Sequence, residues 1–169
     1  MSRERSKEAM SRERSTVTRI RIVIAFCAAI TVLGALATMS TAADKKLYAK
    51  MDGKQEKPPG DVNGVGTAVI TVINTRKVCY DIRPKKAGRR FTFGHIHTGA
   101  KKKVGGVLIT LWRSPKTVKR GKLSGCSTAK ATFIAKLKKK PAGFYVNIHN
   151  SLYTTGAIRG QLTATVPKS

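Results

Sequence analysis

Acidic residues are scarce in this chain, because 8 Asp and Glu stand against 34 Lys and Arg, a formal net charge of +26 over 169 residues. The acids are scattered, so no paired carboxylates suggest general acid and base catalysis. No Ser lies in a nucleophile elbow, and the glycine-containing stretch 60–66 lacks the Lys and the helix that follow in a P-loop. These absences leave catalysis undecided but favour a non-enzymatic protein.

Aromatic residues are also few, at 6% of the chain, and no zinc-finger or RNP pattern occurs. The positive charge would attract any polyanion, but the motifs of base recognition are missing. We therefore expect no specific nucleic-acid partner.

Residues 1–43 have the order of a secretory signal peptide. Basic residues precede an uncharged run of 16 residues, Ile22 to Ala37, and small residues follow it. The run is shorter than the roughly 20 residues of a usual transmembrane helix. We expect cleavage and a secreted or extracytoplasmic domain at 44–169. The alternative is an uncleaved anchor, which would then be the protein's attachment to a membrane.

The predicted exported domain keeps 27 of the 34 basic residues and five of the 8 acids, a formal charge of +22. Such a charge attracts anionic partners in a salt-dependent way, and an anionic cell-envelope polymer or a protein partner would fit. The candidate binding residues form two lysine runs: Lys101, Lys102, Lys103, Lys138, Lys139 and Lys140. The alternative is a solvated surface without a partner.

Two cysteines, Cys79 and Cys126, remain once Cys27 leaves with the signal. An even pair in an exported protein indicates a disulfide. The alternative is a pair of buried thiols.

Segments rich in β-branched and aromatic residues alternate with Gly, Pro and Asn after residue 44, which predicts about seven strands and an all-β fold. Asn74 to Arg76 predicts a hairpin turn between two of them. A helix is expected over Thr128 to Lys139, with Thr128 as its cap. The expected strands are Leu47–Met51, Thr67–Ile73, Val78–Ile82, Phe91–His97, Val107–Trp112, Phe144–His149 and Ala157–Thr165.

All three histidines of the chain, His95, His97 and His149, lie in two short motifs. On a strand, His95 and His97 point to the same face, and His149 could complete a three-histidine site for copper or zinc. The alternative is structural. Phe91 and Phe93 also alternate with His95 and His97, so regular pleating would turn the imidazoles toward an aromatic core.

Arg159 lies among apolar strand residues, where a buried guanidinium needs a partner. Glu56 is the candidate. Their ion pair would join the segment at 55–60 to the last strand, and we expect a structural role for it.

Four motifs stand in a specific order: QEKPPG at 55–60, GHIHTGA at 94–100, FYVNIHN at 144–150 and GAIRGQL at 156–162. Together they resemble the chordin-repeat (CHRD) domain over roughly residues 46–164. The resemblance implies an exported single-domain protein of the bacterial type, whose activity is mostly unassigned, and it does not settle function. The HIH segment is also similar to a strand of copper-zinc superoxide dismutases, but those enzymes use more histidine ligands than this chain holds.

We therefore expect an antiparallel β-sandwich with immunoglobulin-like or dismutase-like topology and one short helix. The favoured function is a non-enzymatic binding or structural module with a basic surface. The alternative is a copper- or zinc-binding protein, with redox chemistry as one option, that uses His95, His97 and His149.

Overall fold

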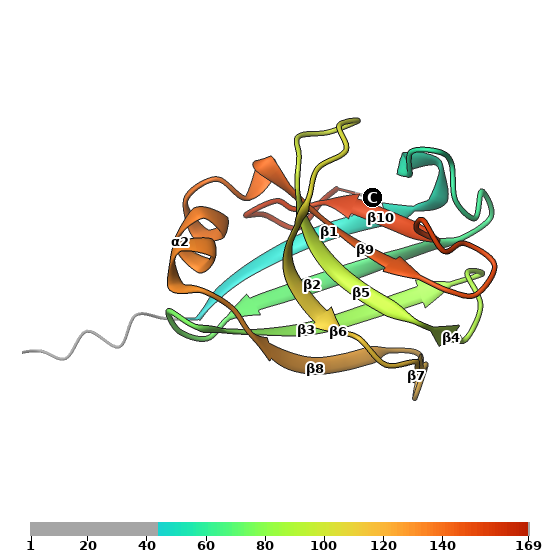
Figure 1. The fold of residues 1–169 in the computed structure, drawn as a ribbon, viewed down its shortest axis with the longest axis horizontal. Coiled ribbons are helices and arrows are strands. Elements are labelled where there is room, and N and C mark those ends of the chain that lie inside the picture. Colours follow the sequence, from blue (N-terminus) through green and yellow to red (C-terminus); the bar gives the residue numbers. More distant parts are fainter. Residues whose placement is uncertain (1–43, 169) are drawn as a thin grey trace, which may run out of the picture. The chain divides into compact units, whose positions relative to one another are not determined.

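The structure, a computed structural model, describes residues 44–168, so the predicted signal segment lies outside the described residues. In chain order the elements are β1 (Lys45–Asp52), η1 (Gly53–Gln55), β2 (Val65–Val72), β3 (Lys77–Lys85), β4 (Arg90–Phe91), β5 (Phe93–Thr98), β6 (Val107–Trp112), β7 (Lys116–Thr117), β8 (Leu123–Thr128), α2 (Ala131–Lys139), η2 (Pro141–Gly143), β9 (Phe144–His149) and β10 (Ile158–Gln161) (Figure 1). Neither α2 nor the two 3-10 turns of this described part is long and apolar enough to cross a membrane.

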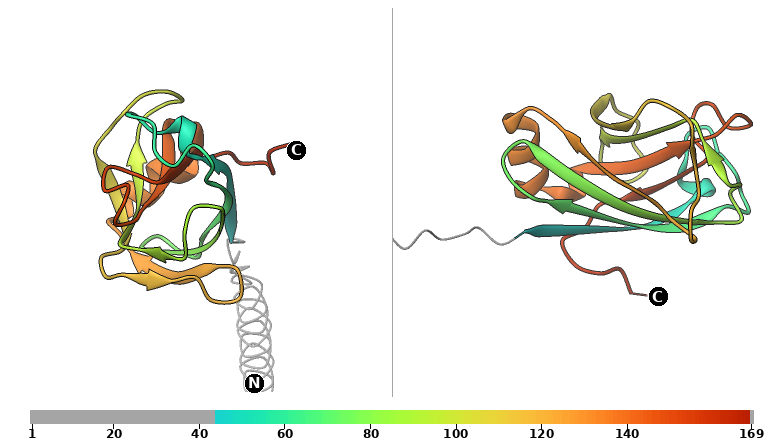
Figure 2. Two further views of the ribbon diagram at one scale, coloured as in Figure 1. Left: turned by 90° about the vertical axis from the view of Figure 1, so that its right-hand side faces the viewer. Right: turned by 90° about the horizontal axis from the view of Figure 1, so that it is seen from below.

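Eight strands form one antiparallel sheet in the order β6-β5-β9-β10-β1-β2-β3-β8, and β4 pairs separately with β7. The sheet turns between β10 and β1, where Asp52 pairs with Arg159. Its edges approach each other, because the Ser127 hydroxyl of β8 donates to the Thr110 carbonyl of β6. The two halves therefore form facing layers (Figure 2), and the expected antiparallel β-sandwich is confirmed.

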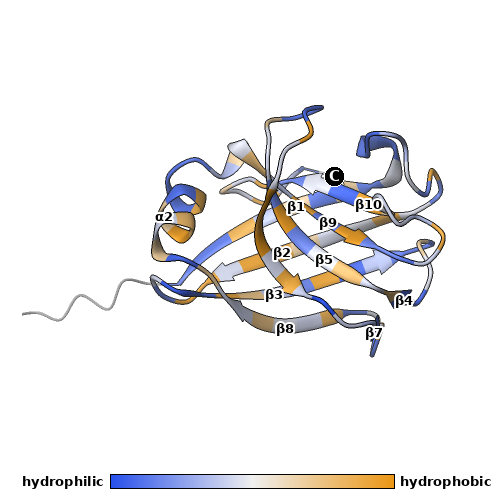
Figure 3. Ribbon diagram, viewed as in Figure 1, coloured by the Kyte–Doolittle hydropathy of each residue, from blue (hydrophilic) through white to orange (hydrophobic). Residues whose placement is uncertain are grey.

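The core lies between these layers and is built by alternation along the strands, visible as alternating apolar and polar positions in Figure 3. β1 and β2 contribute Leu47 and Ile70, and β9 contributes Val146, all fully or almost fully buried. Helix α2 adds Ile134 and Leu137 to the same cluster. Each buried aliphatic side chain of this size contributes about 2 kcal/mol by leaving water.

Several predicted boundaries are confirmed, and others are wrong. The hairpin joins β2 to β3 as expected, but the strand expected over Phe91–His97 is split at Thr92 into β4 and β5. The last strand ends at Gln161, although Thr163 still pairs with Tyr48 as an isolated bridge. The break at Thr92 falls where the chain changes its partner, from β7 to β6 and β9.

The segment before the helix was misread from sequence. Thr128 is not a helix cap, because it ends strand β8, and Lys130 stands at the N-cap position without a side-chain hydrogen bond. β8 was missed since its sequence, LSGCST, is small and polar, and only Leu123 of it is buried. Such a sequence is compatible with an edge strand, but it lacks the β-branched and aromatic residues from which a strand is predicted.

A disulfide attaches this edge strand to its neighbour. Cys79 of β3 and Cys126 of β8 are bonded and directly opposite each other in the antiparallel register, with Cα atoms 3.9 Å apart. The bridge spans a sequence separation of 47 residues. Closing a loop of that length removes entropy from the unfolded chain and contributes roughly 4 kcal/mol.

Candidate functional site

Strand β9 is buried on both faces, which is unusual for a two-layer sandwich. Phe144, Val146 and Ile148 point into the apolar core. Tyr145, Asn147 and His149 alternate with them and point to the opposite side. A second interior therefore exists outside the core, and it is polar.

The register of the neighbouring strands extends this polar side. On β5, His95 pairs with Asn147 and His97 with Tyr145, and on β10, Arg159 pairs with Asn147 from the other flank. Because paired residues share a face, the side chains form one surface across β5, β9 and β10. We call this surface the polar face, and its members are Phe93, His95, His97, Tyr145, Asn147, His149, Arg159 and Gln161.

The prediction that an aromatic core surrounds the histidines is wrong. Phe93 does share the face of His95 and His97, but it is 43% exposed. Phe91 is fully buried, yet it belongs to β4, beyond the break at Thr92. The imidazoles therefore point away from the apolar core and into the polar face.

The three imidazoles converge, since one ring nitrogen from each lies within 4.8 Å of the others. His149 donates from Nδ1 to the Thr154 carbonyl at 2.8 Å. Its Nε2 is then an acceptor in the neutral ring and lies 3.2 Å from His95 Nδ1.

The third ring, His97, is oriented in the same way. Its Nδ1 donates to the Gly105 carbonyl at 3.0 Å, and its plane stacks on the Tyr145 ring with centroids 5.0 Å apart. Its Nε2 is buried and has no hydrogen-bond partner among the described residues. This nitrogen therefore carries a lone pair to which no described side chain or backbone group donates a hydrogen bond.

Burial keeps these histidines neutral. It lowers the pKa of His95 to about 4, with a smaller contribution from the nearby His149 and His97. Burial likewise lowers the pKa of His97 and His149, against the opposing effect of their hydrogen bonds to backbone carbonyls. All three rings therefore present lone pairs at neutral pH.

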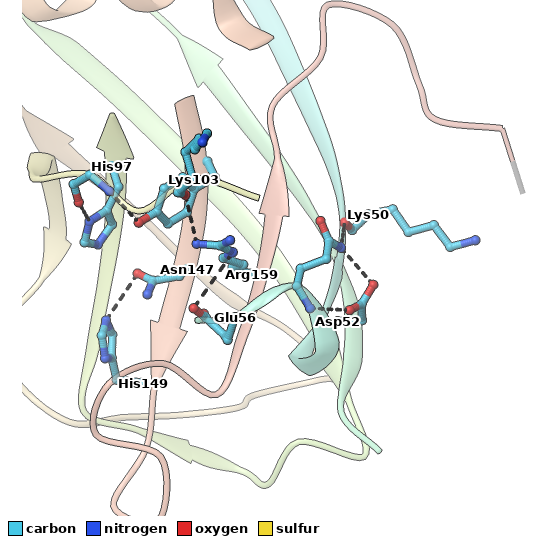
Figure 4. Close-up of polar contacts among 11 residues, drawn as sticks. Lys50, Asp52, Glu56, His97, Lys103, Asn147, His149 and Arg159 are labelled. Carbon is cyan, nitrogen blue, oxygen red and sulfur yellow. Dashed lines mark hydrogen bonds and ion pairs between the residues drawn. The ribbon is translucent and has the colours of Figure 1, made fainter. Parts of the chain in front are cut away.

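Glu56 and Arg159 lie beside the histidines, with the Asn147 side chain between them (Figure 4). The Arg159 Nε is 4.0 Å from Glu56 Oε2, and both side chains are almost completely buried. Burial raises the pKa of Glu56 to about 7, although Arg159 and Asn147 counteract it. The Asn147 side chain also lies 3.2 Å from His149 Nε2, so it is between the ion pair and the histidines.

The loop from Gly99 to Gly106 covers one side of the polar face. Arg159 donates to the Lys103 carbonyl at 3.3 Å, His97 donates to the Gly105 carbonyl, and the Gly105 amide approaches the Tyr145 hydroxyl at 3.5 Å. These contacts hold the first lysine run against the site.

The structure does not bring the two lysine runs together. Lys101 and Lys102 line a pocket of about 120 Å³ with Tyr145 and Arg159. Lys138 and Lys139 belong to the end of α2, on another part of the domain (Figure 1). There they oppose the partial negative charge of the helix C-terminus.

Two motif glycines lie at close contacts, Gly156 beside the Glu56 carboxylate of the site and Gly94 on the core side of β5. A Cβ on Gly156 would come within 2.5 Å of the Glu56 carboxylate, and a Cβ on Gly94 within 2.3 Å of the Trp112 ring. Only glycine permits these close approaches. A groove of about 670 Å³ runs along β1 and β2 and holds none of the histidines.

Sequence reasoning missed Tyr145 and the lysines Lys54 and Lys57 that also line the small pocket. Alternation along FYVNIH was the available signal for Tyr145, because it shares a face with Asn147 and His149. No sequence signal distinguished the two lysines from the many others.

The motifs that build the polar face also carry the comparison with known proteins. The sequence model of the CHRD domain matches residues 47–162. Searches of curated proteins and of solved structures returned no significant match. The match covers more than half of the chain and includes all four motifs, and the chain therefore belongs to the CHRD domain family.

Proposed function

We propose that the domain binds one zinc or copper ion through His95, His97 and His149. The observation that carries the proposal is the orientation of the rings. His97 and His149 each donate Nδ1–H to a backbone carbonyl, which leaves both Nε2 atoms as acceptors beside His95 Nδ1. Metal-ligating histidines have this arrangement, because the second hydrogen bond sets the tautomer and the ring orientation.

The distances also suit a metal site. With metal–nitrogen bonds of about 2.0–2.1 Å, tetrahedral geometry separates two ligand nitrogens by about 3.3 Å. The His95–His149 pair is already at 3.2 Å, and the third ring requires only a small approach from within 4.8 Å. A fourth position would remain for water or an exogenous ligand.

Competing sites for a cation are few. The predicted exported domain contains only five carboxylates, so few other side chains compete with the histidines for a cation. The disulfide fits an oxidising, extracytoplasmic compartment. We infer an exported metal-binding module rather than a reducing-compartment protein.

The proposal is tested by metal titration and elemental analysis of the purified protein, produced without a metal-binding tag. We expect about one zinc or copper ion per chain, lost in the His95→Ala/His97→Ala variant. Thr98→Ala, an exposed change on the same strand, is the control and should keep the ion. Equal metal content in the wild type and the double variant would refute the site.

A second candidate function is binding of an anionic envelope polymer or protein partner, which the +22 charge favours. It predicts retention on an anionic matrix that falls steeply as salt is added. Salt-independent retention would count against it. The two functions use different residues and can coexist.

A further inference from the structure

We propose that the small basic pocket beside the histidines is a binding site for a phosphate-type oxyanion. The pocket has a volume of about 120 Å³ and is lined by Lys54, Gln55, Lys57, Lys101, Lys102, Tyr145, Arg159 and Gln161. Five of these eight residues are cationic, and none is acidic.

The pocket combines one buried cation with four exposed ones. Arg159 is only 3% exposed, so its guanidinium is held in place before any ligand arrives. It makes one hydrogen bond among the described residues, to the Lys103 carbonyl, and it offers five N–H donors in all. The Nε faces Glu56, and the Nη donors that Lys103 does not use remain for a planar, bidentate contact with an oxyanion.

Two rigid segments bring the lysines to the buried arginine. Lys54 lies within the η1 turn and Lys57 follows it, and Asp52 caps the turn by accepting from the Gln55 amide at 2.9 Å. Lys101 and Lys102 lie on the opposite segment, the 99–106 loop, whose Lys103 carbonyl accepts from Arg159. The four lysines therefore come from two separate segments that line one pocket together with Arg159.

The charge of the pocket favours phosphate over a carboxylate. A phosphate monoester carries nearly two negative charges and three acceptor oxygens near pH 7, whereas a carboxylate carries one charge and two oxygens. Glu56 offsets part of the Arg159 charge from 4.0 Å away, but it does not line the pocket. The charges of the four lysines remain unneutralised, and a phosphate group neutralises more of this charge than a carboxylate does.

This inference gives the anionic-partner proposal a defined place and does not depend on the metal. The phosphate group can be free or part of an envelope polymer: free phosphate presents the higher charge on one phosphorus, whereas a phosphodiester polymer presents one charge and two free oxygens per phosphorus, repeated along the chain. A titration with inorganic phosphate and a second one with a polymer of glycerol phosphate separate these sources. If only the polymer binds, the site requires a phosphodiester chain.

The test compares two double variants that remove the same charge. Lys101→Gln/Lys102→Gln changes the pocket, and Lys138→Gln/Lys139→Gln changes the end of α2. Binding is followed at constant ionic strength by calorimetry and by ³¹P NMR, with acetate as the carboxylate control. Arg159 is left unchanged, because its buried ion pair with Glu56 is part of the fold.

We expect the pocket variant to weaken phosphate binding roughly tenfold, which corresponds to losing two exposed charge contacts. The α2 variant should change it less than about twofold. Equal weakening by both variants would overturn the pocket while leaving general attraction of polyanions intact. Failure of phosphate and polymer to bind at all would overturn the phosphate site, whereas salt-dependent retention on a matrix of another anion would still support the anionic-partner function.

Discussion

Both faces of strand β9 are buried, but one is stabilised by apolar packing and the other by polar contacts. On the inner face Val146 and Ile148 pack in an apolar cluster, where every contact stabilises the fold. On the polar face Asn147 and His149 meet other polar groups, and three buried atoms or groups are imperfectly satisfied. These are His97 Nε2, Glu56 Oε1 and the Glu56–Arg159 pair at 4.0 Å.

This difference separates stability from function within one strand. An apolar substitute on the polar face would avoid the desolvation of a carboxylate, a guanidinium and three imidazoles. The cost is understandable if the polar face has a ligand, because a metal ion would satisfy His97 Nε2 and draw the three rings together. The comparison can be tested by changing one face at a time.

The largest expected effect is on the core face. Ile148→Ala removes a fully buried side chain and should lower the free energy of unfolding by about 4 kcal/mol through lost burial and a cavity. Urea unfolding measures it. Variant molecules that remain folded should still bind one metal ion. If folded variant protein lost the ion, stability and metal binding would not be separated between the two faces of β9.

The next effect is the pH dependence contributed by Glu56. Its pKa rises from 4.5 to about 7 in the fold, so the folded state holds the proton more tightly than the unfolded state. The resulting stabilisation is complete below pH 4.5 and is lost as the pH rises through 7. Relative to Glu56→Gln, the wild type should therefore lose about 3 kcal/mol between pH 4.5 and pH 8.

Urea unfolding of both proteins at several pH values gives this difference. The histidines titrate in both, so subtracting the two curves isolates the carboxyl of Glu56. Any constant loss from leaving Arg159 without its partner also cancels. Parallel curves would show that Glu56 has an ordinary pKa and that the polar face is wetter than described.

The smallest effects come from the histidines. His95→Ala should change the stability of the metal-free protein by less than about 1 kcal/mol, because His95 is only half-buried. With zinc at a hundred times its dissociation constant, the wild type should gain about 2.7 kcal/mol and the variant much less. Thermal unfolding with and without zinc measures both, and equal gains would place the metal elsewhere.

Much of the fold was predictable from sequence, because alternation and turn residues are local signals. The hairpin at Asn74 to Arg76 and the strands ending at Trp112 and His149 are examples. β8 was not predictable, since its pairing depends on β3 and on the bridge to Cys79, both distant in sequence. The split after Phe91 was missed for the same reason, because a change of partner strand leaves no local mark.

The candidate site was only partly predictable. The strand period predicts that His95 and His97 share a face. It does not predict whether that face points into the apolar core or away from it. That depends on Thr92, which separates Phe91 from Phe93. The approach of His149 depends on the β5–β9 register, and the carbonyls of Gly105 and Thr154 that orient the rings come from loops.

The most direct test is anomalous diffraction at the zinc edge from crystals of the protein grown with one equivalent of zinc. The account predicts one strong peak bonded to His95, His97 and His149 at about 2.0–2.1 Å, with the Gly105 and Thr154 hydrogen bonds retained. No peak among the three rings, in a protein whose fold is otherwise unchanged, would contradict it.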